Sequence, residues 1–541
     1  MKQVWWHSNG TPVQAEPSSG IIELIRKLEC PYFIVKNSAE PFLTAEGEII
    51  SSNPGNGALP CLGILPGLSP RQLGDPSFQK VHGTSYCYMG GAMAQGISSV
   101  EMVIELGKHG FLGSFGSGGL SIREIEEAIG KVKESLPEGP FAFNLLSSLY
   151  YPDYEKAIVD LYLKHGVRTV EASAYITPSP FLVHYRVAGM TRGVDGAFHA
   201  ENRIIAKISR REVMEKFIEP PSAAILGQLV ASRLVSAEQA EAASRRPLAD
   251  DITVEADSAG HTDNRPLISL LPSLIAVRDQ LQRKFDYGKK VRIGAAGGIS
   301  TPRSALAAFT MGADYIVTGS VNQSCVEAGT SEHTRTLLTQ ATMADVTMAP
   351  AADMFEMGAR VQVLKKGTMF PFVSQKLYDL YRQWSDIGEI PPDERERLER
   401  KVFRKDMDTV WRETMDYFRE RDPKVVENAE SNPKKRMALL FKWYLGQSSR
   451  WAIAGTADRA MDTQIWCGQA MGAFNDWVAG SPLEKPENRR VAEIASLLMH
   501  GAAFLYRIQF LKMLQFPLKP SDERAWPEDI PGPHLNSSEI K

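Results

Sequence analysis

Cysteine is scarce and scattered in this sequence. The five cysteines among 541 residues include no pair at C-x-x-C spacing, so neither a zinc knuckle nor a dithiol redox motif is expected. An odd number of cysteines in so long a chain is typical of free thiols in a reducing compartment. The sequence therefore predicts no metal site.

Excess charge and long apolar runs are also lacking. The formal net charge of −3 leaves no surplus of Lys and Arg for a phosphate backbone, so nucleic acid is not an expected partner. The segment MKQVWWHSNG at the start has no apolar run of the kind found in signal peptides. No uninterrupted stretch of about 18 apolar residues predicts a membrane span. We therefore expect a cytoplasmic protein that does not associate with membranes.

The length and punctuation of the chain predict three regions. A barrel alone can contain about 250 residues, so 541 residues exceed it. Residues 1–75, in which prolines interrupt short apolar runs, are expected to be an irregular small N-terminal module or a wrapping arm, with one helical stretch near 21–28. Residues 76–345 are expected to form one α/β domain. Residues 346–541, where we expect strands to stop, are expected to form a helical domain.

Short apolar runs, glycine-rich turns and helical stretches alternate between residues 80 and 345. The predicted strands are 85–89, 110–113, 141–144, 168–171, 204–207, 252–255, 291–295 and 315–318. Eight strand–helix units are typical of a closed (β/α)8 or TIM barrel, with a doubly wound open sheet as the structural alternative. A longer segment between the fifth and sixth strands predicts two helices, near 221–231 and 237–244.

Helix ends in this region have recognisable signals. Ser98 with Glu101, and Ser121 with Glu124, have the spacing of a capping box and predict two helix starts. Lys164 and His165 followed by Gly166 predict a helix end, with cations in the last turn and a glycine able to adopt positive φ.

Two small-residue turns follow the last two predicted strands. Gly297 and Gly298 follow the seventh strand, and Gly319 and Ser320 follow the eighth. In TIM barrels these two loops commonly bind phosphate through backbone N–H groups and the positive end of a short helix. A Cβ atom would block that close approach. The consecutive order of the turns predicts a phosphate site, with ordinary tight turns as the alternative.

Two further loops at the same end of the barrel contain small residues. Gly91, Ala92 and Met93 follow the first strand and would let a flat ring lie against the backbone. Gly260 and His261 follow the sixth strand, at the end where barrel enzymes place their catalytic groups. His261 can donate a hydrogen bond or a proton near neutral pH.

Polar side chains end the three middle strands. Asn144 ends the third strand, Glu171 the fourth and Lys207 the fifth. Asn144 could bind the edge of a pyrimidine-like ring, and Lys207 could stabilise negative charge on a reduced flavin. Lys207 would also suit Schiff-base chemistry.

Longer motifs occur in a fixed order that resembles known families. G-G-A-M-A, F-N-L-L, A-A-G-G-I and V-T-G-S are together similar to nitronate monooxygenases and to flavin-dependent bacterial enoyl-ACP reductases. The segments 170–175, 250–266 and 464–477 resemble more closely the PfaD family, the trans-acting enoyl reductases of polyunsaturated fatty acid and trans-acyltransferase polyketide synthases. The resemblance covers nearly the whole chain, including its helical C-terminal part.

This resemblance implies FMN as bound cofactor, NADPH as reductant and an enoyl thioester on an acyl carrier protein as substrate. His261 matches the histidine beside the flavin and is the predicted catalytic residue, orienting the thioester carbonyl or relaying a proton. Gln469 stands where most relatives are expected to have proline, a departure in the helical domain that concerns the acyl pocket and not the flavin site. The predicted cofactor-binding residues are Gly91, Ala92, Met93, Asn144, Glu171, Lys207, Gly260, Gly297, Gly298, Gly319 and Ser320.

Three other functions stay open at this point. The same flavin could pass electrons to oxygen, as in nitronate oxidation. Lys207 could instead serve a Schiff-base aldolase. The chain could also be a non-catalytic partner of a synthase that docks through its helical domain. A homodimer is expected because closed twofold assemblies are the commonest.

Overall fold

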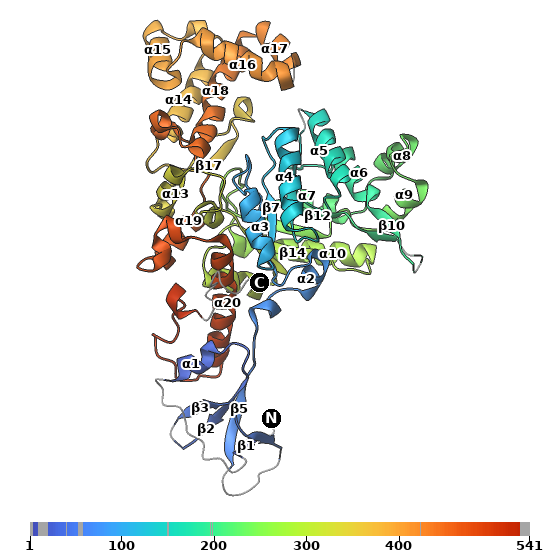
Figure 1. The fold of residues 1–541 in the computed structure, drawn as a ribbon, viewed down its shortest axis with the longest axis vertical. Coiled ribbons are helices and arrows are strands. Elements are labelled where there is room, and N and C mark those ends of the chain that lie inside the picture. The colour runs from blue at the N-terminus through green and yellow to red at the C-terminus, as the bar shows by residue number, and fades with distance from the viewer. Residues whose placement is uncertain are drawn as a thin grey trace.

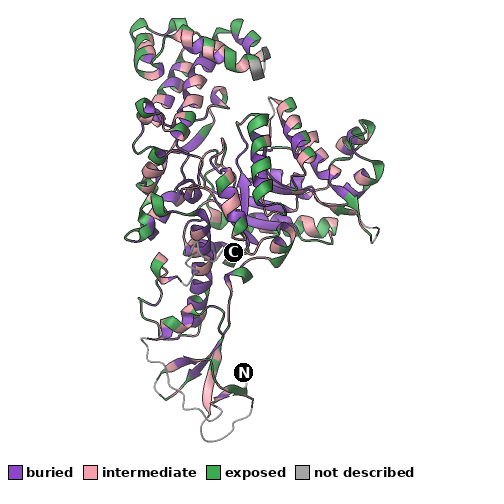
Figure 2. Ribbon diagram, viewed as in Figure 1, coloured by how far each residue is buried: buried purple, intermediate pink, exposed green. Residues whose placement is uncertain are grey.

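A computed structural model describes residues 4–8, 20–38, 40–51, 58–148, 151–194, 196, 198–421 and 423–530 of the chain. The molecule is elongated, with the barrel beside its middle, a small sheet at one end and a group of helices at the other (Figure 1). The strands of the barrel form the most continuously buried part of the view in Figure 2.

Eight parallel strands close into a barrel, as the sequence predicts. The last strand pairs with the first, with Val317 beside Met89, and so closes the sheet. The fold is a TIM barrel, and the open-sheet alternative is wrong. The first two strands begin three and two residues later than expected. In the order in which they pair, the strands are β6 (Tyr88–Gly90), β7 (Leu112–Phe115), β8 (Ala142–Leu146), β9 (Thr169–Ser173), β12 (Arg203–Ile208), β13 (Asp251–Glu255), β14 (Arg292–Ala296) and β15 (Tyr315–Thr318).

Helices between the strands cover the barrel. The expected capping box of Ser121 and Glu124 is present at the start of α4. The box predicted at Ser98 is wrong, because Ser99 caps α3 while the Ser98 hydroxyl accepts a hydrogen bond from the backbone N–H of Met93. The helices are α3 (Val100–Lys108), α4 (Ile122–Ser135), α5 (Pro152–His165), α6 (Pro180–Ala188), α7 (Arg211–Ile218), α8 (Ala223–Ala231), α9 (Ala237–Ala243), α10 (Leu267–Phe285) and α11 (Pro302–Thr310).

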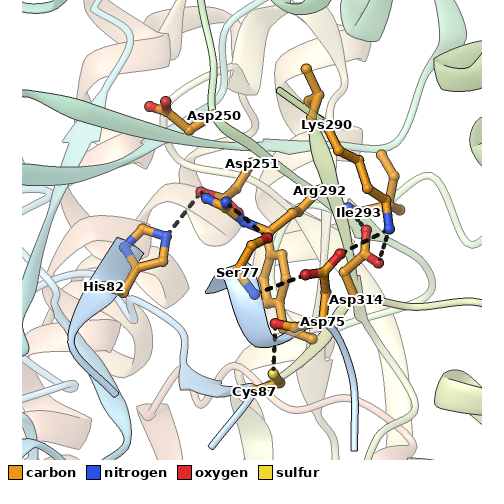
Figure 3. A network of polar contacts seen from close by, with 12 residues as sticks. Asp75, Ser77, His82, Cys87, Asp250, Asp251, Lys290, Arg292, Ile293 and Asp314 are labelled. Atoms are coloured by element: carbon orange, nitrogen blue, oxygen red, sulfur yellow. Dashed lines mark hydrogen bonds and ion pairs between the residues drawn. The ribbon is translucent and has the colours of Figure 1, made fainter. Parts of the chain in front are cut away.

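A short helix, α2 (Pro76–His82), closes the N-terminal end of the barrel. The Phe78 ring stacks on Tyr315 with 4.4 Å between centroids. Asp251 accepts hydrogen bonds from Arg292 at 2.6 and 2.8 Å and lies 2.9 Å from His82 (Figure 3). Burial opposes the Asp251 carboxylate, but Arg292 and His82 outweigh it and lower the pKa of Asp251 to about 2. This network is at the end opposite the predicted site, where barrels place residues that serve stability.

The N-terminal region is a sheet, so the expectation of an irregular module is wrong. Five antiparallel strands pair in the order β3-β2-β5-β1-β4. Pro41 does not prevent this, since it begins the edge strand β3, whose outer side needs no N–H donor. The expected helix is present as α1 (Ile21–Arg26). The strands are β1 (Trp5–His7), β2 (Tyr32–Lys36), β3 (Pro41–Thr44), β4 (Glu48–Ile50) and β5 (Leu59–Leu65).

The expectation that strands stop near residue 350 is also wrong. β16 (Val346–Pro350) and β17 (Arg360–Leu364) form an antiparallel hairpin directly after the barrel. The helices that follow divide between two cores: α14–α18 gather around their own core, whereas α19 and α20 pack into the core shared with the barrel. They are α14 (Phe370–Gln383), α15 (Pro392–Arg397), α16 (Met407–Arg421), α17 (Pro423–Glu430), α18 (Pro433–Ala454), α19 (Ala470–Val478) and α20 (Val491–Met513).

Helix α20 connects the N-terminal sheet to the barrel. Its buried Arg507 donates hydrogen bonds to the carbonyl oxygens of Lys27 and Leu28, both at 2.7 Å. Helix α20 also packs along α11. Within the described residues, α20 is the one helix long and apolar enough to cross a membrane by length and composition. Its most apolar window is 72% buried inside the protein, as the core helix of a folded domain also would be.

Candidate functional site

The turn after β6 connects three strands at the C-terminal rim of the barrel. The backbone N–H of Gly91 donates to the carbonyl oxygen of Thr318 at 2.9 Å, and that of Ala92 donates to Oε2 of Glu171 at 2.8 Å. A Cβ atom on Gly91 would lie 2.9 Å from a methyl group of Val317. A larger residue here would require Val317 to shift, and the predicted residues 91–93 lie at the same rim as Glu171.

Asn144 and Glu171 are adjacent on neighbouring strands. The amide nitrogen of Asn144 donates to the Glu171 carbonyl oxygen at 2.9 Å and to the Ser173 hydroxyl at 3.0 Å. Because these two bonds occupy its N–H groups, Asn144 can offer a ligand only its amide oxygen. The barrel itself thus fixes the orientation of Asn144.

Glu171 has one carboxylate oxygen with a partner and one without. Its side chain is fully buried, Oε2 accepts from Ala92, and Oε1 has no hydrogen-bond partner among the described residues. Leaving such an acceptor unsatisfied costs about 1–3 kcal/mol. Oε1 would lie 3.7 Å from a Cβ placed on Gly91, so it is available to a donor bound against that turn.

The ammonium group of Lys207 is paired with a carboxylate. Its ammonium lies 3.4 Å from Oε1 of Glu255, which also accepts from the Ser258 hydroxyl at 3.2 Å. Burial opposes the charge, but Glu255 and Glu171 outweigh it and raise the pKa of Lys207. A Schiff base requires a neutral amine, so this environment disfavours the aldolase alternative.

The two phosphate-type turns lie side by side because β14 and β15 are paired. Gly297 has φ +84° and sits against the backbone of Ala256 and Asp257, within 2.9 Å of a Cβ placed on it. Cβ positions on Gly298 and Gly319 would meet no atom within 4 Å. The backbone is therefore bare and accessible at the place where an anion was predicted.

Ser320 begins the short helix α12 (Ser320–Gln323). Its hydroxyl oxygen accepts a hydrogen bond from the backbone N–H of Gly468 at 3.2 Å. The predicted phosphate turn is thus in contact with a segment almost 150 residues further along the chain.

The histidine loop after β13 is joined to strand β17. Gly260 and Gln362 exchange backbone hydrogen bonds of 3.0 and 2.7 Å, and the Gln362 amide donates to the Ser258 carbonyl oxygen at 2.8 Å. Along the same edge, β17 is also bridged to Trp466 through Val363, whereas its other edge pairs with β16. The segment 464–477, which contributes to the family resemblance, therefore lies at the barrel mouth.

His261 is paired with an aspartate that the sequence analysis missed. Its Nε2 lies 3.0 Å from Oδ2 of Asp353, and both side chains are about half exposed. Burial opposes the imidazolium, but Asp353 and Glu255 outweigh it and raise the pKa of His261, while Lys207 acts in the opposite direction. Asp353 and Gln362 fall in a region expected to be helical, and no local pattern marked either of them.

Among the described residues, no group of three or more His, Cys, Asp and Glu side chains is arranged to hold a metal ion. The rim instead combines bare backbone turns, a buried acceptor at Glu171, the cation of Lys207 and the imidazole of His261. These groups suit an anionic ligand with a polar planar ring better than a metal.

The fold and this rim define a TIM-barrel protein with its site at the carboxyl ends of the strands. The chain belongs to the nitronate monooxygenase family, whose sequence model matches residues 76–370. A second model, for the inserted helical domain of acyl-carrier-protein S-malonyltransferase, matches residues 384–463.

Relatives of known context support the closer resemblance predicted from the long motifs. The chain is 47% identical to a polyunsaturated fatty acid synthase component from Thraustochytrium sp. over 447 residues, 81% of this chain and 30% of that protein. It is 41% identical to the polyketide biosynthesis protein PksE of Bacillus subtilis over 484 residues, 89% of this chain and 62% of the relative. The chain thus spans less than two thirds of the length of these relatives.

A solved structure extends the comparison to the fold. The enoyl reductase domain of MlnA, from the macrolactin biosynthesis cluster of Bacillus amyloliquefaciens, superposes with a TM-score of 0.78 at 42% sequence identity. The match covers 82% of this chain and 99% of that domain. The predicted resemblance to components of polyunsaturated fatty acid and polyketide synthases is confirmed.

Proposed function

We propose that this chain is an FMN-dependent, NADPH-consuming enoyl reductase that acts in trans on enoyl thioesters carried by acyl carrier protein domains of a polyketide or polyunsaturated fatty acid synthase. The observation that carries the proposal is the convergence of His261, Glu171 and the two glycine turns on one rim, in a chain 42% identical to an enoyl reductase domain.

The rim has groups suited to both ends of FMN. Bare N–H groups at the ends of β14 and β15 would hold the phosphate, and their open Cβ positions leave room for it. Oε1 of Glu171 would accept a hydrogen bond from the ring, and the amide oxygen of Asn144 is a second acceptor. The proposed FMN-binding residues are Gly91, Ala92, Met93, Asn144, Glu171, Lys207, Gly260, Gly297, Gly298, Gly319 and Ser320.

FMN, when bound, supplies hydride transfer, and the protein supplies charge and proton control. Lys207 remains an ammonium beside Glu255 and places a fixed positive charge at the rim, which would stabilise anionic character on a reduced ring. His261 is held near a carboxylate that favours its protonated form. An imidazolium in this position can donate a hydrogen bond to the thioester carbonyl or a proton to the α-carbon.

Segments beyond the barrel would cover the mouth and exclude water. Strand β17 bonds to Gly260, Gly468 bonds to Ser320, and Ser449 of α18 accepts from the Gln95 side chain at 3.1 Å. These contacts support a substrate-covering role for residues 346–541, which we propose here, since water exclusion strengthens every polar interaction in a site.

A direct test uses the product. Crotonyl-loaded carrier protein is incubated with the enzyme and NADPH, and the acyl carrier protein is weighed by intact mass spectrometry. The proposal predicts a gain of two hydrogens that requires NADPH. An unchanged acyl mass across crotonyl and longer enoyl carriers, with FMN-loaded enzyme, would refute it.

A second candidate is a nitronate oxidase on the same fold. It is favoured by the family model that matches the barrel, which bears the name of nitronate monooxygenase. It predicts oxygen consumption with alkyl nitronates and no reduction of enoyl carriers. A non-catalytic synthase partner would instead leave product saturation unaffected by His261→Ala.

A further inference from the structure

Asp353 lies in the connection between β16 and β17, outside the barrel that contains His261. Hydrogen bonds fix this connection both across its own ends and to helix α18. Ala351 donates a backbone hydrogen bond to Ala359 at 2.9 Å, and Glu356 accepts hydrogen bonds from Lys435 and Lys442 of α18. Beyond it, Gln362 and Gly260 are bonded in both directions. The carboxylate therefore approaches His261 from an anchored backbone.

The pair engages only one imidazole nitrogen. Nε2 of His261 faces Asp353 at 3.0 Å, and no hydrogen bond to Nδ1 is found in the part of the chain that the structure describes. A carboxylate accepts but cannot donate, so Nε2 must carry a proton in this contact. Nδ1 is then the nitrogen left to act on a ligand.

We propose that Asp353 is a positioning residue for the enoyl reductase site: it holds the ring of His261 through Nε2–H, so that Nδ1 faces the substrate and donates from the imidazolium. This inference rests on the proposed function for its substrate, but the pairing itself belongs to the free protein.

The charges around His261 favour this state. Asp353 reaches it from the β16–β17 connection, Glu255 from the end of β13 and Lys207 from the end of β12. The first two favour the imidazolium and the third opposes it, and the pKa of His261 is raised. The pKa of Asp353 is lowered because the His261 contact outweighs burial, so the aspartate remains the anion of the pair.

The proton balance follows from these forms. The N–H bond at Nδ1 of the imidazolium breaks, its proton forms the C–H bond at the α-carbon, and neutral imidazole remains with its proton on Nε2. The hydride for the β-carbon would be supplied by the FMN and NADPH of the proposed function. Asp353 stays a carboxylate throughout and neither gains nor loses a proton.

The test is an NMR titration of His261 in the 541-residue chain, assigned with His261→Gln. Nitrogen shifts report which ring nitrogen carries the proton. In the unsubstituted protein we expect the neutral form to be Nε2–H. In Asp353→Asn we expect the pKa to fall and this tautomer preference to be lost, while Asp353→Glu retains part of both. Glu356→Gln is the matched control, since it removes a carboxylate from the same connection without touching His261.

Kinetics separate positioning from a structural role. Asp353→Asn should lower kcat about tenfold with KM little changed, and the alkaline limb of its pH profile should move to lower pH because the imidazolium is lost earlier. Equal titrations of His261 in Asp353→Asn and Glu356→Gln would overturn the inference. A neutral tautomer with the proton on Nδ1 in the unsubstituted protein would overturn it without any substitution.

Failure of the proposed function would look different. If the protein reduces no enoyl carrier but shows the predicted His261 titration, the proposed substrate is refuted and the pairing of His261 with Asp353 is supported. An active reductase in which Asp353→Asn does not change the His261 titration supports the substrate and refutes the pairing.

Discussion

His261 and Asp353 are 92 residues apart in the sequence, yet their side chains meet at 3.0 Å. The contact forms because the chain leaves the barrel after β15, makes the β16–β17 hairpin and returns across the mouth beside the loop after β13. The barrel thus provides the histidine, and the region beyond it provides the group that orients it.

Substitution of His261 should separate the two half-reactions. His261→Ala should lower reduction of the enoyl thioester by about 10²- to 10⁴-fold, the usual contribution of a positioned acid. Reduction of the bound flavin by NADPH should be little changed, because His261 is not assigned to that step. Stopped-flow measurement of each half-reaction decides this, and equal losses in both would contradict the assigned role.

Glu171 should matter for cofactor affinity. Its unpartnered Oε1 is the acceptor that the flavin ring would satisfy, and a hydrogen bond to a charged group contributes about 1.5–3 kcal/mol. Glu171→Gln should therefore weaken FMN binding by about 10- to 100-fold, measured by quenching of flavin fluorescence. An unaltered Kd would remove Glu171 from the cofactor site.

Two glycines give a matched pair for the phosphate turns. Gly319→Ala adds a methyl group that meets no atom within 4 Å, at a backbone of φ −134° and ψ −74°, so it should weaken FMN binding while lowering the melting temperature of the apoprotein less than Gly297→Ala does. Gly297→Ala places the methyl group within 2.9 Å of the Ala256 and Asp257 backbone at φ +84°, so it should lower the melting temperature itself. Thermal unfolding of the two apoproteins and FMN titration of Gly319→Ala check both statements, and normal FMN affinity in Gly319→Ala would contradict the phosphate assignment.

The network around Asp251 at the N-terminal end of the barrel should affect the free energy of unfolding without affecting the candidate site at the opposite end. Asp251→Asn removes the charge that compensates buried Arg292 and changes the carboxylate that contacts His82, and breaking a buried pair from one side costs about 3–5 kcal/mol. Urea unfolding at pH 7 should show this loss. Asp279→Asn, which changes a half-exposed partner of Arg278, is the control and should cost about 1 kcal/mol or less.

The same carboxylate predicts the direction of an acid effect. The pKa of Asp251 is about 2 in the folded protein, below the value of about 3.9 in an unfolded chain. Its contribution is therefore complete above pH 4 and is lost as the pH falls from about 4 toward 2. The free energy of unfolding of Asp251→Asn should depend less on pH across this window than that of the unsubstituted protein. Parallel pH profiles would show that Asp251 is not the group responsible.

The sequence predicted those parts of the molecule that local patterns determine. The barrel strands, the capping box at Ser121 and the turns at Gly297 and Gly319 each arise from residues adjacent in the chain. The loop that contains His261 was predicted for the same reason. By contrast, Asp353 and Gln362 acquire their place only through pairing across about 100 residues, which no single-sequence period records.

The elements that were missed were short strands. VTMAP and RVQVL become β16 and β17 because they pair with each other and because β17 also bonds to the histidine loop. The strand at Pro41 was not predicted, because a proline in a sequence is usually evidence against a strand. An edge strand such as β3 nevertheless tolerates it. In both cases tertiary pairing, rather than intrinsic preference, decided the structure.

The most direct test of the central claim is an anaerobic absorbance spectrum of the purified protein, followed by additions of NADPH and then of a crotonyl carrier-protein thioester. The account predicts flavin bands that bleach with NADPH and return on addition of the thioester. Bands that return only with oxygen or a nitronate would support the flavin site but contradict the enoyl reductase assignment. A colourless protein that cannot be reconstituted with FMN would contradict the cofactor site itself.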